Sequence, residues 1–331
     1  MSTRAKLFEV RGLTTRFHTE AGVATAIDRV DFDIYAGEVL GVVGESGSGK
    51  SVTALSLVRL IPNPPGEISA GSVLFGGRDL LKLDYEALHR VRGKDVAMIF
   101  QEPMTSLNPV FTVGYQIEEI LAEHEKLDKR ERRRRATELL EQVGIPDAAR
   151  RLREYPHQFS GGMRQRVMIA MALACNPALL IADEPTTALD VTIQAQILDL
   201  MLAMKARRAE AAVLLITHDL AVVAETCERV IVMYGGVIQE VAPVAALFAE
   251  PRHPYTIGLL ASLPRPDRET QRRLATIPGT VPSILEMPAG CKFCTRCQLA
   301  EPRCLVEEPA LREVAPGHSV RCHLVDAEVG S

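Results

Sequence analysis

Residues 39–51 read VLGVVGESGSGKS, and this stretch decides the fold. Its first five residues are apolar without interruption, which is typical of a strand covered on both faces. The glycine- and serine-rich turn that follows matches G-x-x-x-x-G-K-[S/T] at every fixed position, and a helical pattern continues over 51–60. In such a turn backbone N–H groups point inward around phosphate oxygens, and the helix directs the positive end of its dipole at the same charge. The stretch therefore predicts a phosphate-binding loop between a buried strand and a helix.

Two side chains of this loop have separate tasks. Lys50 is expected to reach the β- and γ-phosphates of a nucleotide, and the Ser51 hydroxyl to ligate Mg²⁺. A chance glycine-rich turn is the alternative, but the strand before the loop and the helix after it disfavour that interpretation. The predicted phosphate-binding residues are Gly44, Glu45, Ser46, Gly47, Ser48, Gly49, Lys50 and Ser51.

A second apolar run, over 178–182, ends in two acids, Asp183 and Glu184. A carboxylate at the C-terminal end of a strand beside a phosphate loop is placed to hold Mg²⁺, and this is the role predicted for Asp183. Glu184 is suited to polarise a water molecule for in-line attack on the γ-phosphate. Two adjacent acids can also form a solvated turn, but the burial of unpaired carboxylates is costly, which favours a functional site.

The rest of the chain surrounds these segments with alternating strands and helices. Further strands are predicted over 96–100, 213–217 and 230–234, and helices over 162–174, Val191–Arg207 and Leu220–Thr226. This alternation indicates an α/β fold with a mainly parallel central sheet. The stretch from 102 to about 158 is predicted to be a helical insertion. Prolines become dense after about residue 242, which predicts a loop-rich appendage.

Composition narrows the class of protein. The 331 residues suggest about two domains, and 47% hydrophobic residues argue against disorder. A formal net charge of −4 excludes a general basic field for nucleic acid. No apolar run is long enough to cross a bilayer, which needs about 20 residues. Of seven cysteines, five crowd the end of the chain, and in a reducing compartment such a cluster indicates metal or redox chemistry rather than disulfides.

Three further segments complete a recognisable set of motifs. The sequence FSGGMRQR occupies 159–166, Gln101 follows the strand at 96–100, and His218 follows the strand at 213–217. Together with the phosphate loop and the paired acids, they resemble the ATP-binding-cassette (ABC) ATPases over about residues 6–240. The resemblance implies a P-loop NTPase fold: a RecA-like core, an antiparallel β subdomain, and a helical subdomain at about 102–165.

The family pattern implies a role for each motif. Gln101 would contact Mg²⁺ or the attacking water and sense the transmembrane subunit, and His218 would contact the γ-phosphate. A signature loop would bind the γ-phosphate of ATP held by the opposite subunit, through backbone N–H groups that open a helix. The residues that match it are Ser160, Gly161 and Gly162, whereas Phe159 and Met163 replace the usual leucine and glutamine at its ends.

Two further nucleotide contacts follow from the same resemblance. Asp190 matches the aspartate of the D-loop. Phe17 is the aromatic residue expected to stack on adenine, although it can equally be a core residue in an edge strand.

The tail narrows the resemblance further. His253, Pro254 and Tyr255 resemble the element that opens the C-terminal extension of oligopeptide, dipeptide and nickel importer ATPases, and the dipeptide type is the most similar. An ABC ATPase domain over 1–242 and an importer-type extension over 243–331 are therefore expected. The implied activity is ATP hydrolysis that energises import of di- and oligopeptides, at the cytoplasmic face of a bacterial inner membrane.

The implied partners are two membrane permease subunits, a second homologous ATPase subunit and an external solute-binding protein. A nickel or other small-solute importer of the same family remains an alternative. A cassette that acts on nucleic acid is another, invited only by the basic run at 129–135, which is more often a solvated helix face. A cassette that binds ATP without hydrolysing it is disfavoured because all the hydrolytic side chains are present.

The cysteines of the tail can hold a metal centre. The resemblance implies a [4Fe–4S] cluster, which needs four thiolates. Its ligands would be Cys291, Cys297, Cys304 and Cys322, with Cys294 as an extra thiol in the same loop. A Zn²⁺ site and metal-free thiols remain alternatives, since spacing alone does not choose iron over zinc.

Overall fold

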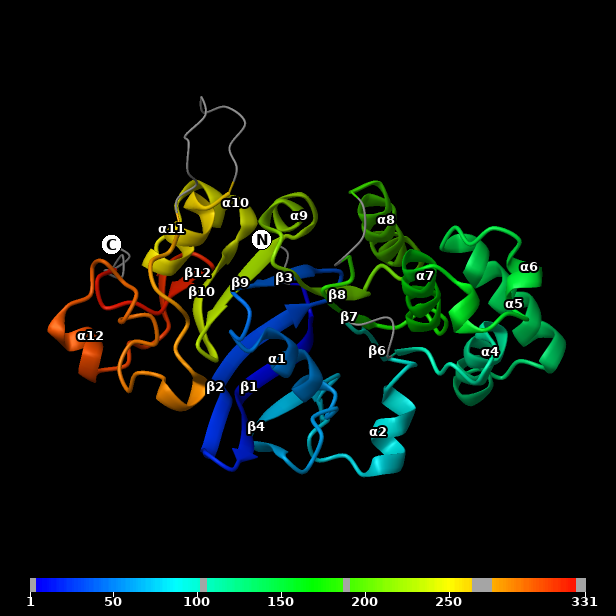
Figure 1. Ribbon diagram of the computed structural model, residues 1–331, viewed down its shortest axis with the longest axis horizontal. Coiled ribbons are helices and arrows are strands. Elements are labelled where there is room, and N and C mark those ends of the chain that lie inside the picture. The colour runs from blue at the N-terminus through cyan, green and yellow to red at the C-terminus, as the bar shows by residue number, and fades with distance from the viewer. Residues whose placement is uncertain (1–3, 102–105, 187–190, 264–275, 326–331) are drawn as a thin grey trace. The chain divides into compact units, whose positions relative to one another are not determined.

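The computed structural model describes residues 4–101, 106–186, 191–263 and 276–325. The chain divides into two compact units (Figure 1). The helix-rich unit comprises Met1–Leu7, Ile34–Glu38 and Lys82–Ile216, and the phosphate-loop unit comprises Phe8–Asp33, Val39–Leu81 and Thr217–Ser331. The family-based boundary between residues 242 and 243 stays a prediction.

An antiparallel sheet, drawn in blue in Figure 1, lies mostly in the phosphate-loop unit. Its strand order is β2 (Gly22–Tyr35), β1 (Lys6–Thr19), β4 (Gly66–Phe75), β5 (Arg78–Asp79). Along β2 the apolar Val30, Phe32 and Ile34 are buried while Asp31 between them is exposed, which is the period-two pattern of a sheet covered on one face. This is the β subdomain that the family resemblance implied.

The second sheet of this unit carries the phosphate loop. Strand β3 (Val39–Val43) is buried along its whole length and pairs in parallel with β9 (Arg229–Tyr234). Helix α1 (Lys50–Leu57) follows the loop and ends earlier than predicted, because Arg59 adopts a left-handed φ of 54°. Helix α9 (Leu220–Thr226) has the predicted bounds.

The C-terminal extension contains more regular structure than its prolines suggested. Strand β10 (Val237–Pro243) pairs antiparallel with β9, and a hairpin of β11 (Arg312–Ala315) and β12 (His318–Val320) continues the sheet on its other side. The helical segments of the extension are α10 (Val244–Ala249), α11 (Pro254–Ala261), η2 (Ile284–Glu286) and α12 (Pro302–Val306). The extension therefore joins the sheet that carries the phosphate loop.

The helix-rich unit has a parallel three-stranded segment in the order β8 (Ala212–Ile216), β7 (Leu179–Asp183), β6 (Val96–Ile99). All five residues of β7 and of β8 are buried, as their continuous apolar sequences predict. The helical segments are α2 (Tyr85–Val91), α4 (Val113–His124), α5 (Lys129–Gln142), α6 (Ala148–Arg151), η1 (Pro156–Gln158), α7 (Gly161–Ala172) and α8 (Val191–Arg207).

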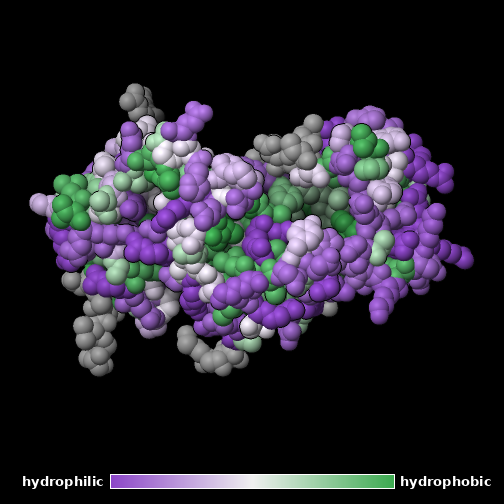
Figure 2. All heavy atoms as spheres, turned by 90° about the horizontal axis from the view of Figure 1, so that it is seen from below, coloured by the Kyte–Doolittle hydropathy of each residue, from purple (hydrophilic) through white to green (hydrophobic). Residues whose placement is uncertain are grey.

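The basic run at 129–135 lies on α5, which a capping box of Asp128 and Glu131 opens. Arg130 and Arg134 are exposed, and two ion pairs join the run to glutamates: Arg133 with Glu118, and Arg134 with Glu138. The run is therefore a solvated helix face. Hydrophilic residues cover much of the surface in Figure 2, with apolar patches between them. Across the described residues, no helix combines the length and apolar character that a bilayer span requires.

Candidate functional site

The phosphate loop lies between β3 and α1, where backbone geometry dictates its glycines. Gly44 has a φ of 153°, and a Cβ there would collide with the carbonyl oxygen of Met233. Gly49, the N-cap of α1, has a φ of 100°, and a Cβ there would come within 2.9 Å of the Ala26 carbonyl oxygen. Both positions require glycine because a side chain would be strained and would clash.

Lys50 lies at the start of α1 and folds its ammonium group into the loop. The residue is only 6% exposed, and Nζ donates to the carbonyl oxygen of Gly44 at 2.7 Å and to that of Glu45 at 3.0 Å. A buried cation and the N-terminus of a helix thus meet at one place, which is the electrostatic requirement of a phosphate site. Ser51, half-buried in the first turn of α1, follows directly.

Glu45 is held by two residues of the C-terminal extension. Its backbone N–H donates to the Tyr255 hydroxyl at 2.8 Å, and its carboxylate accepts two hydrogen bonds from Arg296, at 2.5 and 3.2 Å. Sequence reasoning missed both contacts. Tyr255 was noted only as part of the tail motif. Arg296 lies next to Cys297, and no local sequence pattern links it to Glu45.

The two predicted catalytic acids follow each other at the end of β7. Asp183 is 3% exposed, whereas Glu184 leaves the strand with a left-handed φ of 47°. Such a backbone conformation is strained in a residue other than glycine, and here it sits at the predicted catalytic position. The Gln101 side chain donates to Glu184 Oε2 at 3.1 Å. The structure therefore brings Gln101 and Glu184 together, as a pair that can orient one water molecule.

The predicted signature loop opens α7. Ser160 is the N-cap, and its hydroxyl accepts from the backbone N–H of Met163 at 3.3 Å. Because this bond uses the main chain of residue 163, the absence of the usual glutamine side chain does not disturb the cap. Ser160 and Gly161 are exposed, and a Cβ on Gly161 would meet no atom within 4 Å. Gln165, on the same helix, donates to the carbonyl oxygen of Pro185.

The remaining predicted contacts are distributed as follows. His218 is exposed, and Asp219 after it caps α9 by accepting from the N–H groups of Ala221 and Val222. Phe17 is half-buried near the end of β1, opposite Gly66 of β4, so its stacking role stays a prediction. Asp190 lies outside the described residues.

The tail cysteines converge on one small cavity. Its volume is about 10 Å³, and among its lining residues are Cys291, Cys294, Cys297, Cys304 and Cys322. Burial raises the pKa of the Cys291 thiol to about 12, and it raises the pKa of Cys294, Cys297 and Cys322 as well. None of the five forms a disulfide. The predicted ligand set is thus gathered in one place, with Cys294 added to it.

The described residues that line this cavity are of types that suit a metal cluster, but their arrangement does not form a metal site. Four thiols are the donors that an iron–sulfur cluster needs. Over the described ranges, however, no group of three or more His, Cys, Asp or Glu side chains stands at metal-binding geometry. The predicted [4Fe–4S] cluster is therefore unsupported by the structure, while the donor set that would bind it is present.

A buried polar cluster borders the cavity and ties the tail to the sheet. Glu240 of β10 is fully buried and accepts from the backbone N–H of His253 at 3.0 Å and from His318 Nε2 at 2.7 Å. Burial opposes the charge on Glu240, but the hydrogen bonds, foremost that from His318, lower its pKa below the usual value. Burial also lowers the pKa of His253 to about 4, so this imidazole stays neutral.

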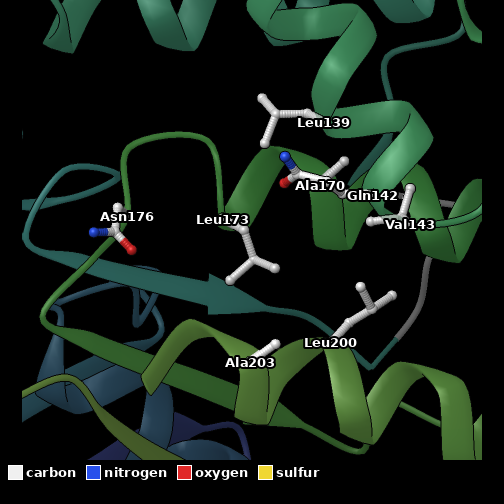
Figure 3. A pocket seen from close by; sticks show the side chains of 8 residues that line it. All are labelled: Leu139, Gln142, Val143, Ala170, Leu173, Asn176, Leu200 and Ala203. Atoms are coloured by element: carbon white, nitrogen blue, oxygen red, sulfur yellow. The ribbon is translucent and has the colours of Figure 1, made fainter. Parts of the chain in front are cut away.

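A separate cavity of about 110 Å³ lies in the helix-rich unit between α5, α7 and α8. Figure 3 shows its lining side chains: Leu139, Gln142, Val143, Ala170, Leu173, Asn176, Leu200 and Ala203. They include none of the predicted site residues and no ionisable group. This cavity is a packing gap between helices rather than part of the candidate site.

Comparison with known proteins finds relatives that match nearly the whole chain. The family described as "ABC transporter" matches residues 27–187, and "Oligopeptide/dipeptide transporter, C-terminal region" matches residues 239–304. The probable peptide ABC transporter ATP-binding protein y4tR of Sinorhizobium fredii is 55% identical over 96% of this chain and 94% of its own. The dipeptide transport ATP-binding protein DppD of Escherichia coli is 51% identical over 96% of each chain.

Solved structures agree with the sequence relatives. The ATP-binding cassette MJ0796, a dimer in a post-hydrolysis state bound to ADP and Pi, superposes with a TM-score of 0.65 and 28% identity. The match covers 72% of this chain and 98% of the cassette. The fold is therefore that of an ABC ATPase cassette, with the C-terminal extension beyond it.

Proposed function

This chain belongs to the ABC transporter ATPases that carry the C-terminal region of the oligopeptide and dipeptide transporters, and we propose that it hydrolyses ATP to energise import of di- and oligopeptides. One observation carries the proposal. The similarity to peptide-import ATP-binding subunits extends over nearly the full length of both chains and includes the tail, which simpler cassettes such as MJ0796 do not match. The built phosphate loop supplies the chemistry that this activity needs.

The proposed hydrolytic step uses the phosphate loop and the acid pair. The loop at 44–51 binds the triphosphate through backbone N–H groups, and Lys50 neutralises charge on the β- and γ-phosphates. Mg²⁺, when bound through Ser51 and Asp183, supplies further charge neutralisation at these oxygens. Glu184, oriented by Gln101, accepts a proton from the attacking water while the bond between the γ-phosphorus and ADP breaks.

The proposed assembly pairs this chain with a second, homologous ATPase subunit. Ser160, Gly161 and Gly162 bind the γ-phosphate of the partner's ATP, and the partner's signature loop completes the site in this chain. The exposed start of α7 supports this role because it presents helical N–H groups at the surface. His218 and Asp190 act at the same closed dimer, and Phe17 stacks on the adenine.

The proposed membrane partners are two permease subunits, which place this chain peripherally at the cytoplasmic face of the membrane. The helical insertion offers a docking surface. Val110, Phe111 and Tyr115 are 69%, 41% and 49% exposed, and the rings of Phe111 and Tyr115 stack at 4.7 Å. Apolar side chains exposed together in this way are typical of a protein contact. An external binding protein would select the cargo, and no role for nucleic acid is proposed.

The activity is tested in the assembled transporter, in proteoliposomes that contain MgATP and a labelled dipeptide. Glu184→Gln is expected to lower ATP hydrolysis and peptide uptake by about 10²–10⁴-fold while ATP binding is retained, because only the proton acceptor is lost. Glu225→Gln, on the exposed face of α9, is the control and should behave as the wild type. Near-normal hydrolysis in Glu184→Gln would remove Glu184 as the base, and uptake of nickel complexes instead of peptides would reassign the cargo.

The cysteine cavity carries a second part of the proposal. Cys291, Cys297, Cys304 and Cys322 hold a [4Fe–4S] cluster, which when bound would supply covalent cross-links between separate segments of the tail. The support is that all four thiols line one cavity. Anaerobically purified protein is expected to be brown and to contain iron and sulfide. Colourless protein with stoichiometric zinc, or with no metal, would overturn the cluster.

A further inference from the structure

The cysteine cavity and the phosphate loop are connected through one arginine. Arg296 lies in the turn that carries Cys294 and Cys297, and its side chain is 5% exposed. Nη1 and Nη2 each donate to one oxygen of the Glu45 carboxylate, in the two-pronged geometry that gives strong and directional ion pairs. The guanidinium also lies 5.7 Å from the centre of the Tyr234 ring.

The tail anchors this guanidinium from its other side. Arg296 Nε donates to the carbonyl oxygen of Pro278 at 3.0 Å, and Nη2 donates to that of Ile277 at 3.4 Å. The side chain is thereby fixed in one orientation, and its charge is directed at Glu45. A fixed guanidinium can position its partner, whereas a mobile surface arginine cannot.

Glu45 passes this restraint to the phosphate-binding lysine. It is the second residue of the loop, and its carbonyl oxygen accepts from Lys50 Nζ at 3.0 Å. Tyr255, fully buried, holds the backbone N–H of the same residue. The tail therefore fixes Glu45 through both its side chain and its main chain, one contact away from the group that binds phosphate.

We propose that Arg296 is a positioning residue of the phosphate loop, through which the cysteine cavity and the nucleotide site are coupled. The inference rests on the proposed function, because it takes the loop at 44–51 as the ATP site. Arg296 neutralises the Glu45 carboxylate, which would otherwise repel an incoming triphosphate. It also holds the loop in the binding geometry, so that less ordering is needed when ATP binds.

The coupling to the cavity follows from the local backbone. The N–H groups of Arg296 and Cys297 both donate to the carbonyl oxygen of Phe293 at 3.0 Å, and that of Cys294 donates to the carbonyl oxygen of Cys291. The cysteines and the arginine therefore belong to one hydrogen-bonded turn. Whatever occupies or rearranges the thiols moves the base of Arg296, and by reciprocity ATP binding restrains the turn.

The first test measures MgATP binding and steady-state hydrolysis in the full transporter. Arg296→Gln is expected to raise the Kd and the KM for MgATP about tenfold with a much smaller change in kcat, because it disturbs the loop and not the proton acceptor. Arg296→Lys keeps the positive charge but not the two-pronged guanidinium, so its Kd for MgATP should lie between those of the wild type and Arg296→Gln. In a Glu45→Gln background, the further change Arg296→Gln should raise the Kd for MgATP by less than twofold, because no carboxylate remains to be neutralised.

The matched control is Arg303→Ala in the same extension. Arg303 forms a bidentate ion pair with Glu307, but both side chains are more than half exposed, so its loss should leave MgATP binding unchanged. If the wild type itself fails to bind MgATP, the proposed function fails. If the wild type binds and Arg296→Gln binds equally well, the positioning role is wrong.

The second test needs no variant to fold. Hydrogen–deuterium exchange of the segment 291–297 in the wild-type transporter should slow when a non-hydrolysable MgATP analogue binds. Helix α2 (Tyr85–Val91), which contributes no residue to the cavity or to the phosphate loop, serves as the internal reference and should not change. An exchange rate in 291–297 that is the same with and without the analogue would overturn the coupling, whatever the variants show.

Discussion

The phosphate loop and the cysteine cavity are two sites in the same compact unit, and they are built in opposite ways. The loop is eight consecutive residues whose backbone does the binding, and its buried charge, Lys50, is satisfied within the loop itself. The cavity gathers thiols from residue 291 to residue 322, and burial keeps the pKa of most of them raised. A contiguous site is fixed by local geometry, whereas a dispersed one depends on how the whole tail packs.

Removal of Lys50 should separate the two sites most clearly. Lys50→Ala is expected to lower kcat/KM for ATP by about 10²–10³-fold, because the principal cation facing the phosphates is lost. The metal content and the thiol count of the cavity should remain those of the wild type, since Lys50 Nζ donates to Gly44, Glu45 and Ser48 of the loop itself. A parallel loss of metal would mean that the loop and the cavity depend on each other for folding.

Acidification should destabilise the protein through His253, which lines the cysteine cavity. Burial lowers the pKa of His253 from 6.5 to about 4 in the folded protein, so the unfolded chain takes up a proton first as the pH falls. The free energy of unfolding should therefore fall by about 3 kcal/mol between about pH 6.5 and pH 4. Glu240, whose pKa is lowered from 4.5, adds a further loss only below that value.

Urea titrations across this range measure the effect. His253→Gln should flatten the dependence above pH 4.5, whereas His18→Gln should retain it, because His18 is 57% exposed and lies far along the chain from the cavity. Identical pH profiles for the wild type and His253→Gln would show that another group is responsible.

The smallest effect distinguishes a buried cysteine from one outside the cavity. Cys322 packs with Val314 and Val320, so Cys322→Ala is expected to destabilise metal-free protein by about 1–2 kcal/mol. Cys175, half-buried in the helix-rich unit, offers the matched substitution, and Cys175→Ala should cost under about 0.5 kcal/mol. Thermal unfolding of the two variants side by side measures the difference. Equal losses would mean that the cavity packs no more tightly than the half-buried site of Cys175.

Regular structure was predictable where burial leaves a continuous pattern. The sequence predicted β3 and the helices at Val191–Arg207 and Leu220–Thr226 with the bounds observed, because apolar runs and helical spacing are local signals. It did not predict β11 and β12. These strands are short and lie in a proline-rich context, and their partner β10 lies about 80 residues earlier, at Glu240 opposite Val320.

The residues of the candidate site also differ in how far the sequence predicted them. Local sequence alone identified the phosphate loop and the acid pair, because each is a compact motif whose chemistry needs neighbouring residues. The signature loop was identified only through the resemblance to ABC ATPases. The contact between Gln101 and Glu184 spans 83 residues, and only the family resemblance suggested a common role for them. The geometry of that contact, and the strained backbone at Glu184, required the fold.

The sequence alone therefore established that the chain has a triphosphate-binding loop. Backbone N–H groups of consecutive residues form such a loop, so its presence does not depend on distant parts of the chain. Only packing decided what supports that loop. Arg296 and Tyr255 reach Glu45 across 251 and 210 residues of chain, and no periodicity or spacing records such a distance. The physical reason is that a long-range contact is selected by the burial of the whole tail against the sheet, and not by the preferences of the residues that make it.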